Sequence, residues 1–133
     1  MPAATLENPA ALVDTSWLAA HLQDADLRIF DCSTQLQFAT GGRRPFRVLD
    51  CAQAHAAGHS PGAGYFDLQG DFSRQDSPLG MTLADPETVT AAFEAAGIDD
   101  RSRVVLYSRN SPSWATRFWW MLHWLGFDRV AVL

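Results

Sequence analysis

A short polar stretch, residues 108–113, is the part of this sequence whose residue types could do chemistry. It follows an apolar run, Val104–Tyr107, and precedes a strongly apolar and aromatic segment, Trp114–Leu125. This order predicts a strand, a tight loop and a helix, and a helix entered in this way directs unpaired backbone N–H groups into the loop. In α/β proteins, ligands bind beyond the carboxyl ends of the strands. We therefore expect the functional site at this loop.

Five residues of the loop carry groups that could bind or react: Ser108, Arg109, Asn110, Ser111 and Ser113. Together with the helix N–H groups they favour a small anion, because the N-terminal end of a helix attracts negative charge. A solvated or interface-filling loop is the other interpretation. A serine acts as a nucleophile only with an activating base, and no G-x-S-x-G elbow surrounds Ser108. We therefore do not expect serine catalysis.

The other residues that could react or bind a metal are scattered through the chain. Cys32 and Cys51 form neither a C-x-x-C pair nor a zinc-binding set, and His21, His55 and His123 share no ligand spacing. We expect no metal and no cofactor. Neither cysteine follows the central strand, so we expect small buried side chains, with a reactive thiol at Cys51 as the alternative. The cysteine usage also favours a reducing, cytoplasmic compartment.

Helical and strand patterns alternate along the chain around this loop. Asp85-Pro86-Glu87 combines an N-cap, a proline at the first helical position and an acid in the first turn, and Gly97 and Gly126 suit helix ends. The alternation predicts an α/β fold with a largely parallel sheet. The expected helices are 16–23, 86–96 and 114–125, and the expected strands are 27–30, 65–68, 104–107 and 129–133.

Three segments give weaker signals. Residues 34–47 contain a Gly-Gly-Arg-Arg-Pro turn between Phe38 and Phe46, which indicates a loop or a short excursion. Residues 50–58 are rich in alanine and indicate a helical turn, whereas residues 70–81 are polar and indicate a loop.

The composition is that of one globular domain. The 133 residues are 47% hydrophobic and 19% charged, with a net charge of −5. A chain of this length and hydrophobic content can bury a single core. No run of basic residues is present, so we expect no nucleic-acid partner. The longest apolar stretch is shorter than the roughly 20 residues that span a bilayer, so we expect no membrane partner. Residues 1–12 are interpreted as a loose lead-in to a domain at 13–133.

Ordered segments spread over almost the whole chain match one known family: VDTSWLAAHL, LRIFDCS, AGHSPGAGYFDL, MTLADPETVTAAFEAAGI, RVVLYSRNSPSWATRFWWMLHWLGF and DRVAVL. The sequence resembles a rhodanese domain, in particular the N-terminal half of tandem thiosulfate or 3-mercaptopyruvate sulfurtransferases. The G-H-x-P-G-A element at Gly58–Ala63 and the R-x-W-W-M pattern at Arg117–Met121 are its most specific motifs. In this family His59, Pro61 and Gly62 belong to a structural signature.

The resemblance implies a three-layer α/β fold with a mainly parallel central sheet flanked by helices on both sides. It also implies a mechanism, in which a cysteine directly after the central strand carries sulfur as a persulfide. Backbone N–H groups and the helix N-terminus lower the pKa of such a thiol. In this sequence the position is Ser108, and Ser111 and Pro112 stand where the loop's glycine is expected. We therefore predict a non-catalytic domain.

The aromatic segment after the loop is richer in large side chains than one face of a sheet requires: Trp114, Phe118, Trp119, Trp120 and Trp124. Exposed apolar patches usually mark interfaces, so this helix is a candidate partner surface. The resemblance implies that the partner is a second, catalytic rhodanese domain, with a homo-oligomer through the same helix as the second possibility. The alternative is a stand-alone inactive module that recognises an anion or a protein. The sequence stops at residue 133 inside an expected strand, which predicts a domain incomplete at its C-terminal end.

Overall fold

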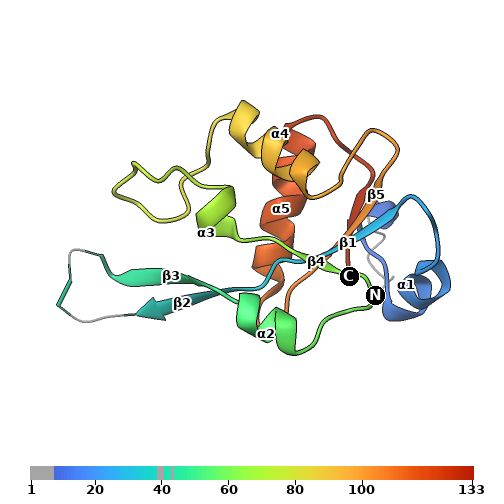
Figure 1. Ribbon diagram of the computed structural model, residues 1–133, viewed down its shortest axis with the longest axis horizontal. Coiled ribbons are helices and arrows are strands. Elements are labelled where there is room, and N and C mark those ends of the chain that lie inside the picture. Colours follow the sequence, from blue (N-terminus) through green and yellow to red (C-terminus); the bar gives the residue numbers. More distant parts are fainter. Residues whose placement is uncertain (1–7, 39–40, 43) are drawn as a thin grey trace, which may run out of the picture.

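Four parallel strands form one central sheet in the order β4-β1-β5-β6 (Figure 1). The computed structural model describes residues 8–38, 41–42 and 44–133. The strands are β1 (Leu27–Asp31), β4 (Gly64–Tyr65), β5 (Arg103–Tyr107) and β6 (Val130–Val132). The inner strands β1 and β5 have apolar residues at their centres, Ile29-Phe30 and Val104–Leu106, as is usual for strands covered on both faces. The predicted parallel α/β sheet is confirmed.

Helices cover both faces of this sheet, as predicted. They are α1 (Thr15–His21), α3 (Leu68–Asp71), α4 (Pro86–Ala95) and α5 (Pro112–Trp124). Helix α1 packs on one face through Leu18, which clusters with Ile29 and Val105. Helices α3, α4 and α5 pack on the other face, to which Phe30 and Val104 point. The two sets of strand residues alternate because successive side chains of a strand point to opposite faces.

Phenylalanines occupy the centre of the larger core: Phe30, Phe66, Phe72, Phe93 and Phe118. The ring centroids of Phe30 and Phe66 lie 4.1 Å apart, and those of Phe66 and Phe118 lie 4.9 Å apart. Aromatic pairs at such separations contribute dispersion and burial beyond the area of a single ring. This cluster fixes α5 against the sheet, and α5 in turn positions the loop that precedes it.

Polar caps and glycines set the helix ends, at Asp85, Gly97 and Gly126 as predicted, whereas α5 begins at Pro112 rather than at residue 114. Asp14 caps α1 by accepting a hydrogen bond from the Trp17 backbone N–H at 2.7 Å, and Asp85 caps α4 by accepting one from the Thr88 N–H at 2.8 Å. Directly after the C-caps of α4 and α5, Gly97 and Gly126 adopt positive φ angles of 96° and 88°. Only glycine adopts this conformation without strain, so both helices stop there.

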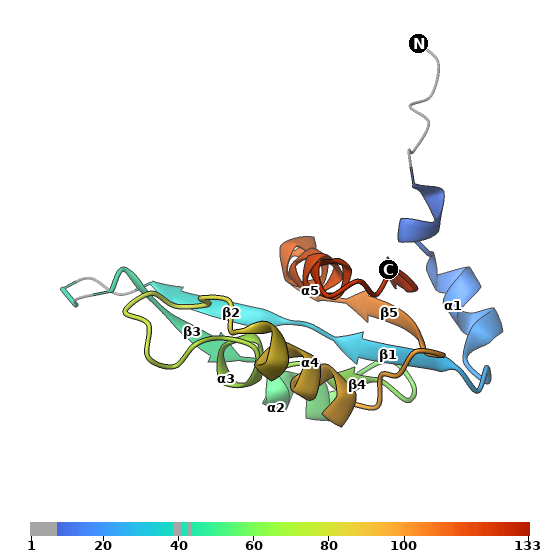
Figure 2. The same ribbon diagram turned by 90° about the horizontal axis from the view of Figure 1, so that it is seen from above.

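The segment interpreted as a loop or short excursion forms a two-stranded antiparallel sheet. Strands β2 (Thr34–Phe38) and β3 (Phe46–Asp50) pair from Thr34 with Asp50 to Phe38 with Phe46. The hairpin reaches away from the central sheet, as both views show (Figures 1 and 2). Isolated hairpins are marginal, and this one is covered near its middle, where Gly80 lies against Val48.

The segment around residues 64–71 differs from the prediction. Instead of a strand at 65–68 followed by a loop, β4 ends at Tyr65 and α3 begins at Leu68. The reason is Asp67, whose carboxylate accepts a hydrogen bond from the Gly70 N–H at 2.9 Å and caps the short helix. The helical turn expected at 50–58 is found as α2 (Ala52–Ala57).

The N-terminal segment meets the last strand of the sheet. A 3₁₀ turn, Pro9–Ala11, leads to Leu12, which forms a parallel bridge with Val132. The Val13 N–H donates to the carbonyl of Val132 at 3.0 Å. Of the predicted lead-in, residues 1–7 lie outside the described part of the chain. None of the helices in the described ranges has the length and apolar character needed to cross a membrane.

Candidate functional site

The parallel pairing of β1 and β5 brings two polar segments together at the carboxyl edge of the sheet. Asp31 pairs with Tyr107, so the residues that follow each strand lie side by side. The Cys32 N–H donates to the carbonyl of Tyr107 at 2.7 Å, which extends this contact beyond the strands. The loop predicted to be functional, residues 108–113, therefore faces residues 32–34.

Two hydrogen bonds attach the loop to the turn after β1. The Arg109 N–H donates to the Ser33 hydroxyl oxygen at 3.0 Å, and the Asn110 side-chain amide donates to the Thr34 carbonyl at 3.0 Å. Because Ser33 and Thr34 are buried, these bonds hold the loop in one position rather than leave it to solvent.

The remaining polar groups of the loop bind one another. The Ser108 hydroxyl donates to the Ser111 carbonyl. The Ser111 hydroxyl caps α5 by accepting from the Ser113 N–H at 3.3 Å, and it lies 2.7 Å from the Ser113 hydroxyl. Pro112, the first residue of α5, has no N–H to offer. Much of the donor capacity that would suit an anion is therefore already used within the loop.

A buried carboxylate beneath the loop organises the charges of the site. Asp31 is fully buried and accepts hydrogen bonds from the N–H and hydroxyl of Ser33 at 3.0 and 2.6 Å. Its second oxygen lies 3.2 Å from His55 Nδ1 and 3.9 Å from Arg109 Nε. A buried carboxylate is stable only with such partners. Asp31 was not among the predicted site residues. The sequence did contain a signal for it, because Asp31 comes directly after a predicted strand and the carboxyl ends of parallel strands meet at one edge of the sheet.

The G-H-x-P-G-A element forms a turn that packs beside the same edge. His59 Nδ1 donates to the His55 carbonyl at 2.7 Å, and the two imidazole rings stack with centroids 4.1 Å apart. Gly62 has a positive φ of 76°, and Pro61 precedes it in the exposed turn. The Ser60 N–H donates to the Tyr107 hydroxyl oxygen at 3.1 Å. In both hydrogen bonds a side chain of this region pairs with a backbone group, which is what an element with a structural role would do.

Neither cysteine lies in the loop. Cys32 is completely buried, and burial raises the pKa of its thiol, with the neighbouring Asp31 adding to the effect. Partial burial also raises the pKa of Cys51; Asp31 and Asp50 act in the same direction and Arg109 opposes them. A raised pKa keeps a thiol protonated and poorly nucleophilic near neutral pH.

Tyr65 links Cys51 to the turn after β1. Its hydroxyl accepts a hydrogen bond from the Cys51 N–H at 2.6 Å and donates one to the Ser33 carbonyl at 2.7 Å. Burial raises the pKa of the Tyr65 phenol above its ordinary value. The start of α2 is thus fastened to the same buried turn as the loop.

Helix α5 buries one side and exposes two tryptophans on the other. Phe118, Met121 and Leu122 are buried in the core. Trp120 and Trp124 are 49% and 40% exposed, and their rings lie nearly parallel with centroids 6.0 Å apart. The predicted division of the aromatic helix into a core face and an outer face is therefore present.

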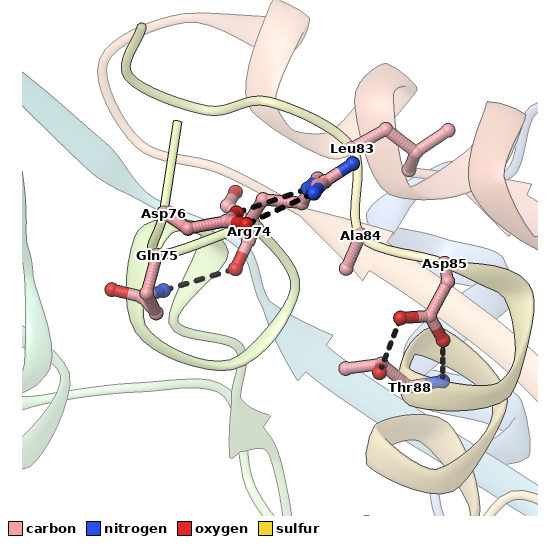
Figure 3. A pocket seen from close by; sticks show the side chains of 8 residues that line it. Arg74, Gln75, Asp76, Leu83, Ala84, Asp85 and Thr88 are labelled. Atoms are coloured by element: carbon pink, nitrogen blue, oxygen red, sulfur yellow. Dashed lines mark hydrogen bonds and ion pairs between the residues drawn. The ribbon is translucent and has the colours of Figure 1, made fainter. Parts of the chain in front are cut away.

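A hollow with a volume of about 530 Å³ lies elsewhere, lined by residues 73–76, 83–85 and 88. Figure 3 shows its side chains bonded in local pairs: Arg74 with Asp76 at 3.0 Å, and Asp85 with Thr88. No residue of the 108–113 loop lines it. Within the described ranges, no three His, Cys, Asp or Glu side chains are placed to hold a metal ion.

Comparison with known proteins gives a consistent result. The sequence pattern of the rhodanese-like domain matches residues 14–133. The chain is 33% identical over 121 residues to 3-mercaptopyruvate sulfurtransferase of Escherichia coli K12, covering 91% of this chain and 40% of the relative. It is 34% identical over 122 residues to thiosulfate/3-mercaptopyruvate sulfurtransferase 2 of Arabidopsis thaliana, covering 92% of this chain and 33% of the relative.

A solved structure supports the fold. The crystal structure of SseA from Escherichia coli, a 3-mercaptopyruvate sulfotransferase, superposes with a TM-score of 0.72 at 32% identity. The match covers 92% of this chain and 44% of that protein. The chain thus spans less than half the length of the relatives it matches.

Proposed function

The chain belongs to the rhodanese-like domain family, and from this premise we propose that it is a non-catalytic rhodanese domain of a sulfurtransferase. The observation that carries the proposal is Ser108. It is the first residue after the central strand β5, and its hydroxyl is engaged with the carbonyl of Ser111. No His or carboxylate in the described part of the chain is hydrogen-bonded to this hydroxyl, so no base activates it.

The chemistry of sulfur transfer explains why this residue is decisive. A thiolate attacks the outer sulfur of a donor such as thiosulfate, forms a new sulfur–sulfur bond and releases sulfite. The resulting persulfide then passes its terminal sulfur to an acceptor. An alcohol is a far weaker nucleophile than a thiolate at neutral pH, and it cannot form a persulfide.

The two cysteines offer no substitute in this proposal. Cys32 lies under the sheet edge with no exposed surface, and Cys51 lies at the start of α2 rather than in the loop. Both thiols have raised pKa values. Both are free, and a reducing, cytoplasmic compartment is part of the proposal for that reason.

We assign the chemistry to a cysteine in a second domain, with thiosulfate or 3-mercaptopyruvate as the sulfur source. The support is the greater length of the relatives, two of which are named for these donors. The outer face of α5 is the proposed contact, because Trp120 and Trp124 form an exposed apolar pair. A second copy of the chain on the same face is the other partner to be tested.

A direct test uses the chain alone. It is incubated with thiosulfate or with 3-mercaptopyruvate, and intact-mass analysis records the addition of a sulfur atom while thiocyanate formation from cyanide records turnover. We expect neither. The Cys51→Ser and Ser108→Ala variants serve as controls. Turnover that either substitution abolishes would contradict the proposal.

The alternative is a stand-alone module that recognises an anion or a protein. The tryptophan pair favours a protein ligand. An anion at Ser108, Arg109, Asn110, Ser111 and Ser113 has less support, because these groups already bond to each other and to the turn after β1. Titration of the chain with thiosulfate or phosphate, followed by NMR shifts of the loop amides, distinguishes the two modes of recognition.

A further inference from the structure

A small apolar groove lies between α4 and the C-terminal end of α5. Its volume is about 160 Å³, and its apolar side chains are Phe93, Ile98, Leu122, Leu125 and Phe127. Phe93, Ile98 and Leu122 are buried and form the floor, whereas Leu125 and Phe127 are half-buried and form a wall. The groove lies at the opposite end of α5 from the 108–113 loop, about 20 Å along a helix of this length.

The size of the groove suits one large apolar group. A cavity of about 150 Å³ lined by Leu, Ile and Phe accommodates a benzene molecule. The volume of about 160 Å³ therefore matches one aromatic ring or one branched aliphatic side chain. It is too small for most cofactors or drug-sized ligands, which occupy about 300 Å³ or more.

Three exposed carboxylates rim the groove: Glu94, Asp99 and Asp100. In the described part of the chain, no Arg or His side chain lies within 4.0 Å of them as an ion-pair partner. Arg28 donates from Nε to the Gly97 carbonyl at 3.2 Å. Hydrogen bonds from the Arg101 N–H and the Ser102 hydroxyl, together with the positive charge of Arg28, lower the pKa of Asp99, so its carboxylate stays charged near neutral pH.

We propose that this groove binds a basic segment of a partner protein, inserting one apolar side chain between α4 and α5 and placing flanking Lys or Arg residues on Glu94, Asp99 and Asp100. Charge complementarity selects this occupant. A second copy of a chain with net charge −5 or an anionic lipid surface would bring like charges to the rim. The proposal concerns a surface separate from the loop and stands independently of the role in sulfur transfer.

The test uses short blocked peptides and the complete chain labelled with ¹⁵N. The first peptide has a central leucine flanked by lysines; in the second, glutamates replace the lysines; in the third, serine replaces the leucine. We expect saturable binding of the first peptide only, with the largest shifts in the amides of Phe93, Leu122 and Leu125.

Matched charge variants separate groove binding from general attraction to an acidic protein. Glu94→Gln with Asp100→Asn should weaken binding of the first peptide by about tenfold, because two surface ion pairs are lost. Asp24→Asn with Asp71→Asn removes the same charge from exposed positions outside the groove and should change the affinity less than twofold. Thermal unfolding checks that every variant is folded.

Three outcomes would overturn the proposal. They are the absence of saturable binding by the first peptide, equal weakening in the groove and control variants, and shifts centred outside the groove. Self-association of the unlabelled chain in sedimentation, abolished by the groove variant, would identify a second copy as the occupant and would equally reject a basic partner segment.

Discussion

The helices α4 and α5 begin in the same way but in different surroundings. Each has a polar cap followed by proline, Asp85-Pro86 for α4 and Ser111-Pro112 for α5, and in each the cap accepts a hydrogen bond from a backbone N–H of the first turn. The start of α4 borders an open hollow whose polar groups pair locally (Figure 3). The loop that leads into α5 is hydrogen-bonded through Arg109 to the turn after β1, above a buried carboxylate.

This difference shows that a capped helix start does not by itself distinguish a functional loop from an ordinary one. The strand-loop-helix order indicated residues 108–113 as the site. The start of α4 has the same polar cap followed by proline, but it does not lie at the carboxyl edge of the sheet. The distinguishing feature is Asp31, whose carboxylate contacts Ser33 in the turn after β1, His55 in α2 and Arg109 in the loop. The experiments below separate what the cap contributes from what this network contributes.

The largest effect is expected from Asp31→Ala. It leaves Ser33, His55 and Arg109 without their common acceptor and opens a small void, so we expect a loss of about 3 kcal/mol in the free energy of unfolding. Urea denaturation monitored by tryptophan fluorescence measures it. Asp26→Ala, which removes an exposed ion pair with Arg129, is the matched control and should cost far less. Equal losses of unfolding free energy in the two variants would show that the Asp31 network stabilises the fold no more than an exposed ion pair does.

A smaller effect is expected from removing the α5 cap. Ser111→Ala deletes the acceptor of the Ser113 N–H and should cost about 1 kcal/mol, whereas Ser111→Asp should retain most of the stability because aspartate also caps. The same denaturation experiment measures both. A loss in Ser111→Ala comparable to that of Asp31→Ala would mean that the cap, rather than the carboxylate, holds this region.

The two caps should differ in their response to acid. The hydrogen bond from the Thr88 N–H lowers the pKa of Asp85 below its ordinary 3.8, so this cap stabilises the fold fully above that value. Its contribution is lost as the pH falls through the lowered pKa, because the protonated acid is the weaker acceptor. Asp85→Ser should therefore flatten the dependence of unfolding on pH below about 4. A variant with the unchanged acid profile would contradict this assignment.

The smallest effect is expected from Ser108→Cys. The new thiol would occupy a loop that has Ser111 and Pro112 at its end and no glycine, so we expect no persulfide and no thiocyanate in the assay described above. The control is Ser108→Ala, which should behave identically. Stable persulfide in the cysteine variant would show that the loop retains the geometry of a sulfur-carrying site.

Helix α4 and strand β5 could be predicted because their signals are local. Pro86 and Gly97 bound α4, and a run of apolar residues marks β5; the structure has both. The hairpin gave a weaker signal. Leu36 and Val48 lie opposite each other, but each strand has only five residues and the cover from the loop at Gly80 is distant in sequence.

The composition of the site was predictable only in part. The sequence correctly placed Ser108 directly after the central strand, but it started the helix at residue 114, whereas Ser111 caps a helix that begins at Pro112. It could not indicate that Ser33 and Thr34 hold the loop, because those bonds join residues far apart in the chain. The partners of Asp31 likewise depend on the order of strands in the sheet, which no local pattern specifies.

The bridge between Leu12 and Val132 has a consequence for how this domain assembles. Leu12 and Val13 can pair with Val132 only after β6 has been synthesised, and β1 can pair with β5 only after β5 has been synthesised. Because these pairings join segments far apart in the sequence, we expect the sheet to become stable only after β6 has been added to it. Until then, the edge of β5 that pairs with β6 stays unpaired and is a site at which another chain could add as a strand.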